Sequence, residues 1–368
     1  MSNKGNLREV ASVFLKLGTI AFGGPAAHIA LMEREIVQKR KWITPEHFLD
    51  LVSATNLIPG PNSTEMAMHC GHERAGFKGL LVAGALFIMP AVAITSFFAW
   101  LYMLYGGLPT VQPFLVGIKP AVIAIIAGTL YNLGKKALKN TTLMLLMLFT
   151  VVACFLGLHE IIAFFSCGVL GLLLYWLRRG RLYCIGGLLL IEPMIVSAGK
   201  IFWIFLKVGA LLYGSGYVLF AFLDAELVAK GLLSRQELVD AVAVGQFTPG
   251  PVLSTATFIG WQMHGVMGAI LATVGIFLPS FAFVVLLNPL IPKMRRSKPF
   301  SAFLDAVNVA SVAVLFVVCV NMGREAILDW RTAVIAVVSL AVFLAFKNLS
   351  SAIIIAGGAA IGYFLSSI

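Results

Sequence analysis

Apolar runs long enough to cross a lipid bilayer recur along this chain of 368 residues. A helix needs ~20 residues to span the ~30 Å hydrocarbon layer, and runs of about that length lie at residues 77–105, 111–133, 266–291 and 303–321. Charged residues make up only 12% of the chain, about half of the ~25% in an average soluble domain. A soluble fold could not bury this much apolar surface, so the sequence predicts an all-α, polytopic membrane protein.

The charges and cysteines narrow the class further. The formal net charge is +11, and an excess of Lys and Arg in a membrane protein marks cytoplasmic loops that face anionic lipid. We therefore predict the lipid bilayer as a partner and no nucleic acid. The cysteines have no C-x-x-C pair and no metal-ligand spacing, so they are predicted to be core residues: Cys70, Cys154, Cys167, Cys184 and Cys319. The N-terminal apolar segment lacks a small-x-small cleavage site and is predicted to be a retained first helix.

The chain contains two related halves. The motif F-L-K-x-G at 14–18 returns at 205–209, and P-G-P at 59–61 returns at 249–251. Further landmarks, such as Pro90 and Pro279, keep the same order and nearly the same offset, which is the signature of an internal repeat. We predict an N-terminal transporter repeat at 1–181, a connecting segment at 182–200 and a C-terminal repeat at 201–368. The alternative to a transporter is that the duplication only enlarged a helical bundle.

Loop charges predict that the two repeats have inverted topology. The connection at 106–112 has no basic residue, whereas its repeat partner at 292–299 carries four, and short cytoplasmic loops concentrate Lys and Arg. If each P-G-P element is a re-entrant or broken hairpin, each copy crosses the membrane five times. The prediction is thus about 10 spans plus two P-G-P hairpins. Inverted repeats are a transporter architecture.

Four helix breaks interrupt the apolar segments, at 22–25, 59–61, 213–216 and 249–251. Proline lacks a backbone donor and glycine tolerates unusual dihedral angles, so these motifs must break a helix. Irregular backbone at membrane depth is tolerated only where it is buried in protein or lines a cavity. Half-helices that begin at such breaks direct N–H groups into the gap, which suits an anion. The alternative is a packing kink or a loop turn.

Small and polar residues beside the breaks form the predicted substrate site. Hydroxyl and amide donors can replace part of the hydration shell of a tetrahedral oxyanion, although a Ser or Thr can also bond back to its own helix. The predicted substrate-binding residues are Lys16, Gly23, Gly24, His28, Asn56, Gly60, Asn62, Ser63, Lys207, Gly214, Ser215, Gln246, Thr248, Gly250 and Ser254.

Three ionisable residues carry specific hypotheses. Lys16 and Lys207 recur at matching positions in apolar helices, and we predict that they meet near the midplane as a charge pair for a dianion. The alternative is that each lysine snorkels to the interface. Glu65 has no repeat partner; it is either a proton-coupling group or the partner of a cation such as Arg74.

A rival interpretation is a membrane-embedded metalloenzyme, based on His69-Cys70-Gly71-His72-Glu73. The spacing of the two histidines fits one helical face, but no H-E-x-x-H motif follows. We predict no metal, no cofactor and no catalytic residue. Neither a Walker A loop nor a Rossmann fingerprint occurs, which argues against ATP-driven pumping by this chain.

The motifs around these breaks resemble the chromate ion transporter family. They are F-G-G-P-A-A-H at 22–28, I-P-G-P-N-S-T-E-M at 58–66 and G-Q-F-T-P-G-P at 245–251. The resemblance implies a multi-pass protein of the bacterial inner membrane that exports chromate and confers chromate resistance. The inverted repeats predict that transport occurs by alternating access, and a homodimer is left open. Transport of sulfate or another oxyanion, or a channel-like anion pore, remains an alternative. The second copy lacks counterparts of His28 and Glu65, so the halves are predicted to play unequal roles.

Overall fold

A computed structural model describes residues 7–108, 111–177, 198–213, 216–287, 297–346 and 349–366. Within these ranges all regular structure is helical. Five helical segments are long and apolar enough to cross a membrane, and three shorter apolar helices accompany them. The predicted all-α, multi-pass class is therefore confirmed.

The elements of the N-terminal half follow one another in a simple order. They are α1 (Leu7–Ile20), α2 (Pro25–Met32), η1 (Glu33–Lys39), α3 (Pro45–Thr55), α4 (Asn62–Tyr105), α5 (Gln112–Ala137), α6 (Thr141–Phe155) and α7 (Glu160–Leu177). The C-terminal half repeats this order in α8 (Ala198–Leu211), α9 (Val218–Leu223), η2 (Asp224–Val228), α10 (Arg235–Phe247), η3 (Val252–Ser254), α11 (Thr255–Leu287), α13 (Lys298–Ala326), α14 (Trp330–Ala345) and α15 (Ser351–Ser366).

The helices before the two P-G-P motifs begin in the same way. Thr44 accepts a hydrogen bond from the backbone N–H of His47 at the start of α3, and Pro45 occupies the first helical position. Ser234 and Glu237 form a capping box at the start of α10. Side chains that satisfy otherwise unpaired N–H groups fix where a helix starts. Both halves therefore use a local signal to begin the arm that leads to the P-G-P motif.

The chain turns back after the first helix of each half. After α1 ends and Gly23 adopts a φ of +106°, the chain returns alongside α1, so that Glu35 in η1 binds Lys16 and Trp42 binds Glu9. The C-terminal half reverses likewise between α8 and η2. In the N-terminal half the Gly-Gly-Pro break lets the chain reverse in this way. Each half therefore has two broken hairpins where the sequence predicted one.

α4 is a hairpin of two helical arms rather than one long rod. Ala75 and Gly76 leave helical geometry, with a φ of +62° at Gly76. In a continuous helix Gly71 and Gly79 would be ~12 Å apart along the axis. Here a carbon atom added to Gly71 would overlap the carbonyl of Gly79, so the two arms contact each other. α11 reverses in the same way at Gly265, with a φ of +56°. Each P-G-P motif therefore lies between two short arms, and only the second arm of α4 or α11 has the length of a crossing.

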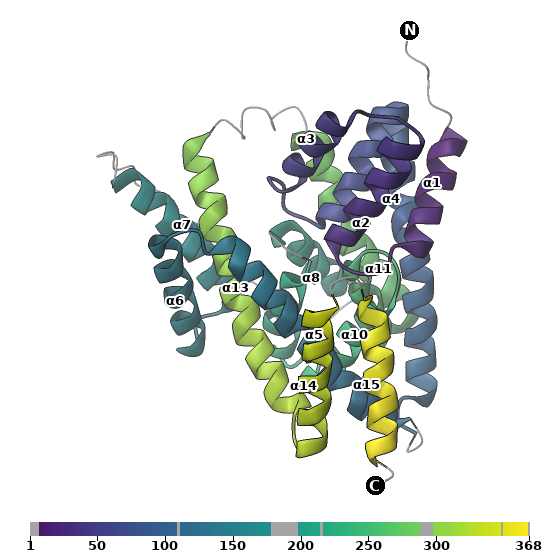
Figure 1. Cartoon of the computed structure of the whole chain (residues 1–368), viewed down its shortest axis with the longest axis vertical. Coiled ribbons are helices and arrows are strands. Elements are labelled where there is room, and N and C mark those ends of the chain that lie inside the picture. Colours follow the sequence, from purple (N-terminus) through teal and green to yellow (C-terminus); the bar gives the residue numbers. More distant parts are fainter. Residues whose placement is uncertain are drawn as a thin grey trace.

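Figure 1 shows how the two halves are placed. The start of α1, the whole of α3 and the N-terminal end of α13 lie at one end of the molecule. α4 ends at the opposite end, where α14 begins and α15 finishes. The C-terminal end of α4 and the N-terminal end of α13, which flank repeat-related connections, thus lie at opposite ends.

Candidate functional site

The four breaks meet in pairs, each pair joined by a hydrogen bond between the halves. The backbone N–H of Gly60 donates to the carbonyl of Leu212 at 2.7 Å, and the N–H of Gly250 donates to the carbonyl of Ala21 at 2.8 Å. Leu212 and Ala21 are the first residues after α8 and α1. Each P-G-P motif therefore contacts the first break of the other half, and we call these two contacts the crossing bonds.

Only glycine fits at the two donors of the crossing bonds. Gly60 has a φ of +141° and Gly250 a φ of +96°, which residues with a side chain rarely adopt. A carbon atom added to Gly60 would overlap the carboxylate of Glu65 and lie 2.6 Å from the hydroxyl of Ser280, whereas one added to Gly250 would lie 2.9 Å from Cβ of Ala91. The backbone has to approach its neighbours closely at both positions.

The surroundings of Gly60 are polar. Glu65 is fully buried, and the described residues provide no hydrogen-bond partner for either of its carboxylate oxygens. The hydroxyls of Thr64 and Ser280 are also buried without such a partner. Arg74 binds Glu9 at 2.7 Å, so it is not the partner of Glu65 that the sequence left open. Buried polar groups without partners are costly, which marks this region as a place for a ligand or a proton.

The surroundings of Gly250 are different. Ala91 lies beside Gly250, where its repeat counterpart Ser280 lies beside Gly60. The second half has a threonine at the position that matches Glu65. The amide nitrogen of Gln246 and the hydroxyl of Ser254 are buried without a partner in the described ranges. A largely apolar cavity of about 530 Å³, lined in part by Phe22 and Pro249, adjoins this crossing bond. The two sides of the site are therefore chemically unequal.

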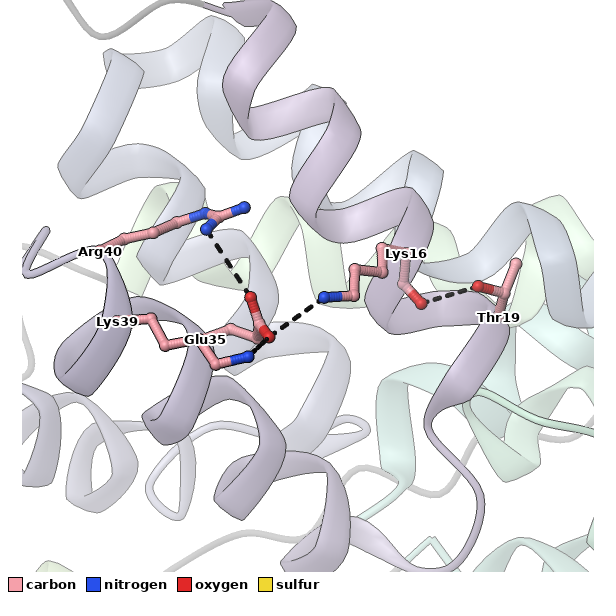
Figure 2. A network of polar contacts seen from close by, with 5 residues as sticks. All are labelled: Lys16, Thr19, Glu35, Lys39 and Arg40. Atoms are coloured by element: carbon pink, nitrogen blue, oxygen red, sulfur yellow. Dashed lines mark hydrogen bonds and ion pairs between the residues drawn. The ribbon is translucent and has the colours of Figure 1, made fainter.

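The two predicted lysines lie in separate ion-pair clusters. Glu35 accepts from Lys16 at 3.2 Å and from Lys39 at 2.6 Å, and Arg40 lies 3.7 Å from its second oxygen (Figure 2). We call these four residues the first lysine cluster. Hydrogen bonds from Lys39 and Lys16 outweigh burial and lower the pKa of the Glu35 carboxyl.

The second lysine cluster consists of Lys207, Glu226 and Lys230. Glu226 accepts from Lys207 at 2.8 Å and from Lys230 at 2.6 Å. Burial acts to raise the pKa of Glu226, but the hydrogen bonds from the two lysines outweigh it, so that the pKa lies below its usual value. The expected pairing of Lys16 with Lys207 is thus replaced by pairing of each lysine with a glutamate of its own half, because the returning arm brings that carboxylate beside it.

Several other predicted residues bond within their own segment. The side chain of Asn62 donates to that of Asn56 at 2.7 Å, and Asn56 donates to the carbonyl of Val52. The hydroxyl of Thr248 donates to the carbonyl of Val244 at 2.7 Å. Such back-bonding is the alternative weighed for any Ser or Thr in a helix.

The remaining predicted residues lie around the first break or beside Gly60. His28 is buried with its ring 5.8 Å from that of Phe87, and a carbon added to Gly24 would lie 3.6 Å from the hydroxyl of Tyr217. Ser63 is buried in the first turn of α4. Gly214 and Ser215 lie outside the described residues.

Sequence reasoning missed a partly buried ion pair between the halves. Lys119 of α5 lies 3.4 Å from Asp240 of α10, and the hydroxyl of Tyr102 donates to the other oxygen of Asp240 at 2.8 Å. Lys119 was a signal in the sequence, since it is a lone cation in the apolar run at 111–133, and ionisable residues within spans are rare and functional. Asp240 gave no such signal, because it follows a charged stretch.

The proposed metal motif has not assembled a ligand set in the described part of the chain. No group of three or more His, Cys, Asp or Glu side chains gathers there. Glu73 instead lies 3.3 Å from His47.

A bundle of apolar helices whose broken hairpins contact one another between the two halves is typical of multi-pass membrane proteins of the transporter class. The family model described as "Chromate transporter" matches residues 8–172 and again 199–363. The chain therefore belongs to the chromate transporter family, whose members are transporters and not enzymes.

Several transport proteins are similar to this chain. The chain is 33% identical to the chromate transport protein of Cupriavidus metallidurans, over 97% of this chain and 92% of that protein. It is 32% identical to a probable chromate transport protein of Synechococcus elongatus, over 91% and 89% of the two chains, and 26% identical to an uncharacterized transporter of Methanocaldococcus jannaschii, over 99% and 95%. No solved structure matches.

Proposed function

We propose that this protein exports chromate, a small tetrahedral oxyanion, through the region where the crossing bonds join the two halves. The crossing bonds carry the proposal, because they join each P-G-P motif to the residue just before the first break of the other half. Half-helices that begin at these breaks direct backbone donors toward the interface, which suits an anion. Membership of the chromate transporter family and relatives named as chromate transport proteins support this substrate.

The proposed mechanism is alternating access by two halves of inverted topology. Repeat-related helix ends at opposite ends of the molecule support it, as do the reversed loop charges. We place the protein in the bacterial inner membrane with the N-terminal end in the cytoplasm, and we divide it at 1–181, 182–200 and 201–368. A dianion leaving an inside-negative cell gains ~4.6 kcal/mol per 100 mV, so export could run on the membrane potential and confer chromate resistance.

Glu65 is the proposed coupling group. A buried carboxyl without a partner is stable only when neutral or when a cation joins it, and Arg74 is occupied by Glu9. Among the described residues, Tyr213 beside the break after α8 is the titratable group on which the charge of Glu65 acts. If Glu65 holds a proton while the anion occupies the interface, movement of the proton is coupled to movement of the anion.

Counterflow in proteoliposomes tests the proposal. Vesicles loaded with unlabelled chromate should transiently accumulate labelled chromate, and an excess of outside chromate should abolish this accumulation. Sulfate and molybdate as competitors decide whether another oxyanion is preferred. Flux without counterflow would favour the second candidate, a channel-like anion pore, and no flux of any oxyanion would overturn both.

A further inference from the structure

We infer that the two lysine clusters are docking sites for the transported oxyanion, one at each opening of the transporter. This rests on the proposed function and adds two binding sites to it. In this scheme the anion binds one cluster, moves to the interface of the halves, and leaves past the other cluster.

The clusters are equivalent parts of the duplicated chain. Lys16, Glu35 and Lys39 of the first cluster each lie 191 positions before their counterparts in the second, since 207 − 16, 226 − 35 and 230 − 39 all equal 191. Both glutamates lie in a π-helical segment, η1 or η2, on the arm that returns beside the lysine. Such segments are rare and are frequently found at functional sites. The same arrangement therefore occurs in both halves.

Each cluster carries an excess of positive charge. Three cations surround Glu35, a net charge of 3 − 1 = +2, and two surround Glu226, a net charge of 2 − 1 = +1. The lowered pKa values of both glutamates keep them ionised at neutral pH. An ionised carboxylate alone does not neutralise either cluster, so each retains attraction for a dianion.

The side chains of Lys16 and Lys207 remain partly exposed although each binds a buried glutamate. The side chains of Glu35 and Glu226 are 6% and 0% exposed, whereas Lys16 is 51% and Lys207 31% exposed. Figure 2 shows Lys16 reaching Glu35 from α1 while Lys39 and Arg40 reach it from the returning arm. An ammonium has three donors. The buried carboxylate thus holds the lysines from the inside while their other donors can bind an oxyanion.

Each cluster lies a short way from a crossing bond. Lys16 precedes Ala21 by five residues, and Lys207 precedes Leu212 by five residues, a helical rise of ~7.5 Å in each case. Ala21 and Leu212 provide the carbonyls of the two crossing bonds. Because the halves are proposed to be inverted, the first cluster should serve the cytoplasmic opening and the second the external opening.

The test measures chromate transport from each face separately, in everted and in right-side-out membrane vesicles. Lys16→Gln and Lys39→Gln should raise the KM for chromate about fivefold from the cytoplasmic face only, with the maximal rate retained, because steering charges act on encounter. Lys207→Gln and Lys230→Gln should do so from the external face only. High ionic strength should shrink both effects, and Lys16→Arg should restore the KM.

Matched variants distinguish substrate docking from a structural brace, that is, from ion pairs that only stabilise the fold. Lys78→Gln changes the same charge at an exposed lysine of the α4 turn, outside both clusters, and should leave both KM values unchanged. Glu35→Gln should lower the cytoplasmic KM, because it removes the opposing charge. Equal loss of thermal stability in Lys16→Gln and Glu35→Gln, with both KM values unchanged, would overturn docking in favour of a brace.

A lipid phosphate could bind the same cations. If the effect of Lys16→Gln disappears in liposomes of phosphatidylcholine alone and returns with anionic lipid, the clusters bind headgroups and the inference is wrong. A KM effect that persists in phosphatidylcholine supports substrate docking. Wild-type protein that fails chromate counterflow would overturn the proposed function itself, a result distinct from all of these.

Discussion

The backbone N–H of Gly60 donates a 2.7 Å hydrogen bond to the carbonyl of Leu212, 152 residues further along the chain. The bond from Gly250 to Ala21 repeats it with the halves exchanged. Both donors come from a P-G-P motif, and both acceptors lie just before the first break of the other half. Backbone groups freed by a helix break need partners in a membrane, and here each half supplies them to the other. Movement of one half against the other would therefore alter the proposed transport site.

Replacement of the crossing-bond glycines should stop transport. In Gly60→Val and Gly250→Val a β-branched side chain meets a positive φ and close neighbours, so we expect chromate counterflow to be lost. Gly231→Val is the matched control, since Gly231 has a φ of +68° but no atom within 4 Å of an added carbon. Full counterflow by either test variant, at normal membrane yield, would show that its P-G-P motif is only a structural turn.

The inverted topology predicts the sidedness of two helix ends. In a cysteine-free background, a cysteine replacing Lys298 at the start of α13 should react with a membrane-impermeant thiol reagent only from the cytoplasm. A cysteine replacing Leu108, which is 44% exposed just after α4, should react only from outside. Reaction of both positions from one side would contradict the inverted arrangement.

Loss of the Glu65 carboxyl should separate exchange from net transport. Glutamine keeps the shape but cannot release a proton, so Glu65→Gln should retain chromate counterflow while net export loses its dependence on pH. Glu46→Gln, an exposed position in the first turn of α3, is the control. If Glu65→Gln shows the pH profile of the wild type, Glu65 is not the coupling group.

The Lys119–Asp240 pair should behave as a buried charge pair. Removal of one partner leaves an uncompensated buried charge, which typically costs ~3–5 kcal/mol, so Lys119→Met and Asp240→Leu should each lower the thermal unfolding midpoint strongly in detergent. The double variant should recover most of this loss. Additive effects in the double-mutant cycle would mean that the two residues do not interact.

The buried glutamates of the lysine clusters predict how stability depends on pH. The pKa values of Glu35 and Glu226 lie below their usual value of 4.5 in the folded protein. Their contribution to the free energy of unfolding is therefore fully present above the unfolded pKa and is lost as pH falls through the folded pKa. The thermal midpoint of the wild type should exceed that of Glu35→Gln/Glu226→Gln at pH 7, and the difference should vanish well below pH 4.5. A constant difference down to that pH would contradict this assignment.

The class of fold, the duplication and the positions of the breaks could be predicted from the sequence alone. Apolar runs, P-G-P and the F-L-K-x-G repeat are local features, and local features decide whether a segment enters the membrane and where its helix stops. The same features located Gly60, Gly250 and Glu65, which the structure brings to the interface of the halves or beside it. The resemblance of these motifs to the chromate ion transporter family is confirmed by the family match.

The pairing of the breaks and of the charges became visible in the folded chain and could not be predicted from its sequence. The direction of the chain after Gly23 and Gly76 depends on what each arm packs against, so the sequence could not show that α1 turns back or that α4 folds on itself. The partners of Lys16, Lys207 and Lys119 were hidden for the same reason. Glu35 and Glu226 lie 19 residues from their lysines, and Asp240 is brought to Lys119 from the other half. Hydropathy and helix breaks are properties of a local stretch of sequence. An ion pair between residues far apart in the sequence depends on how whole helices pack, so the sequence alone does not reveal it.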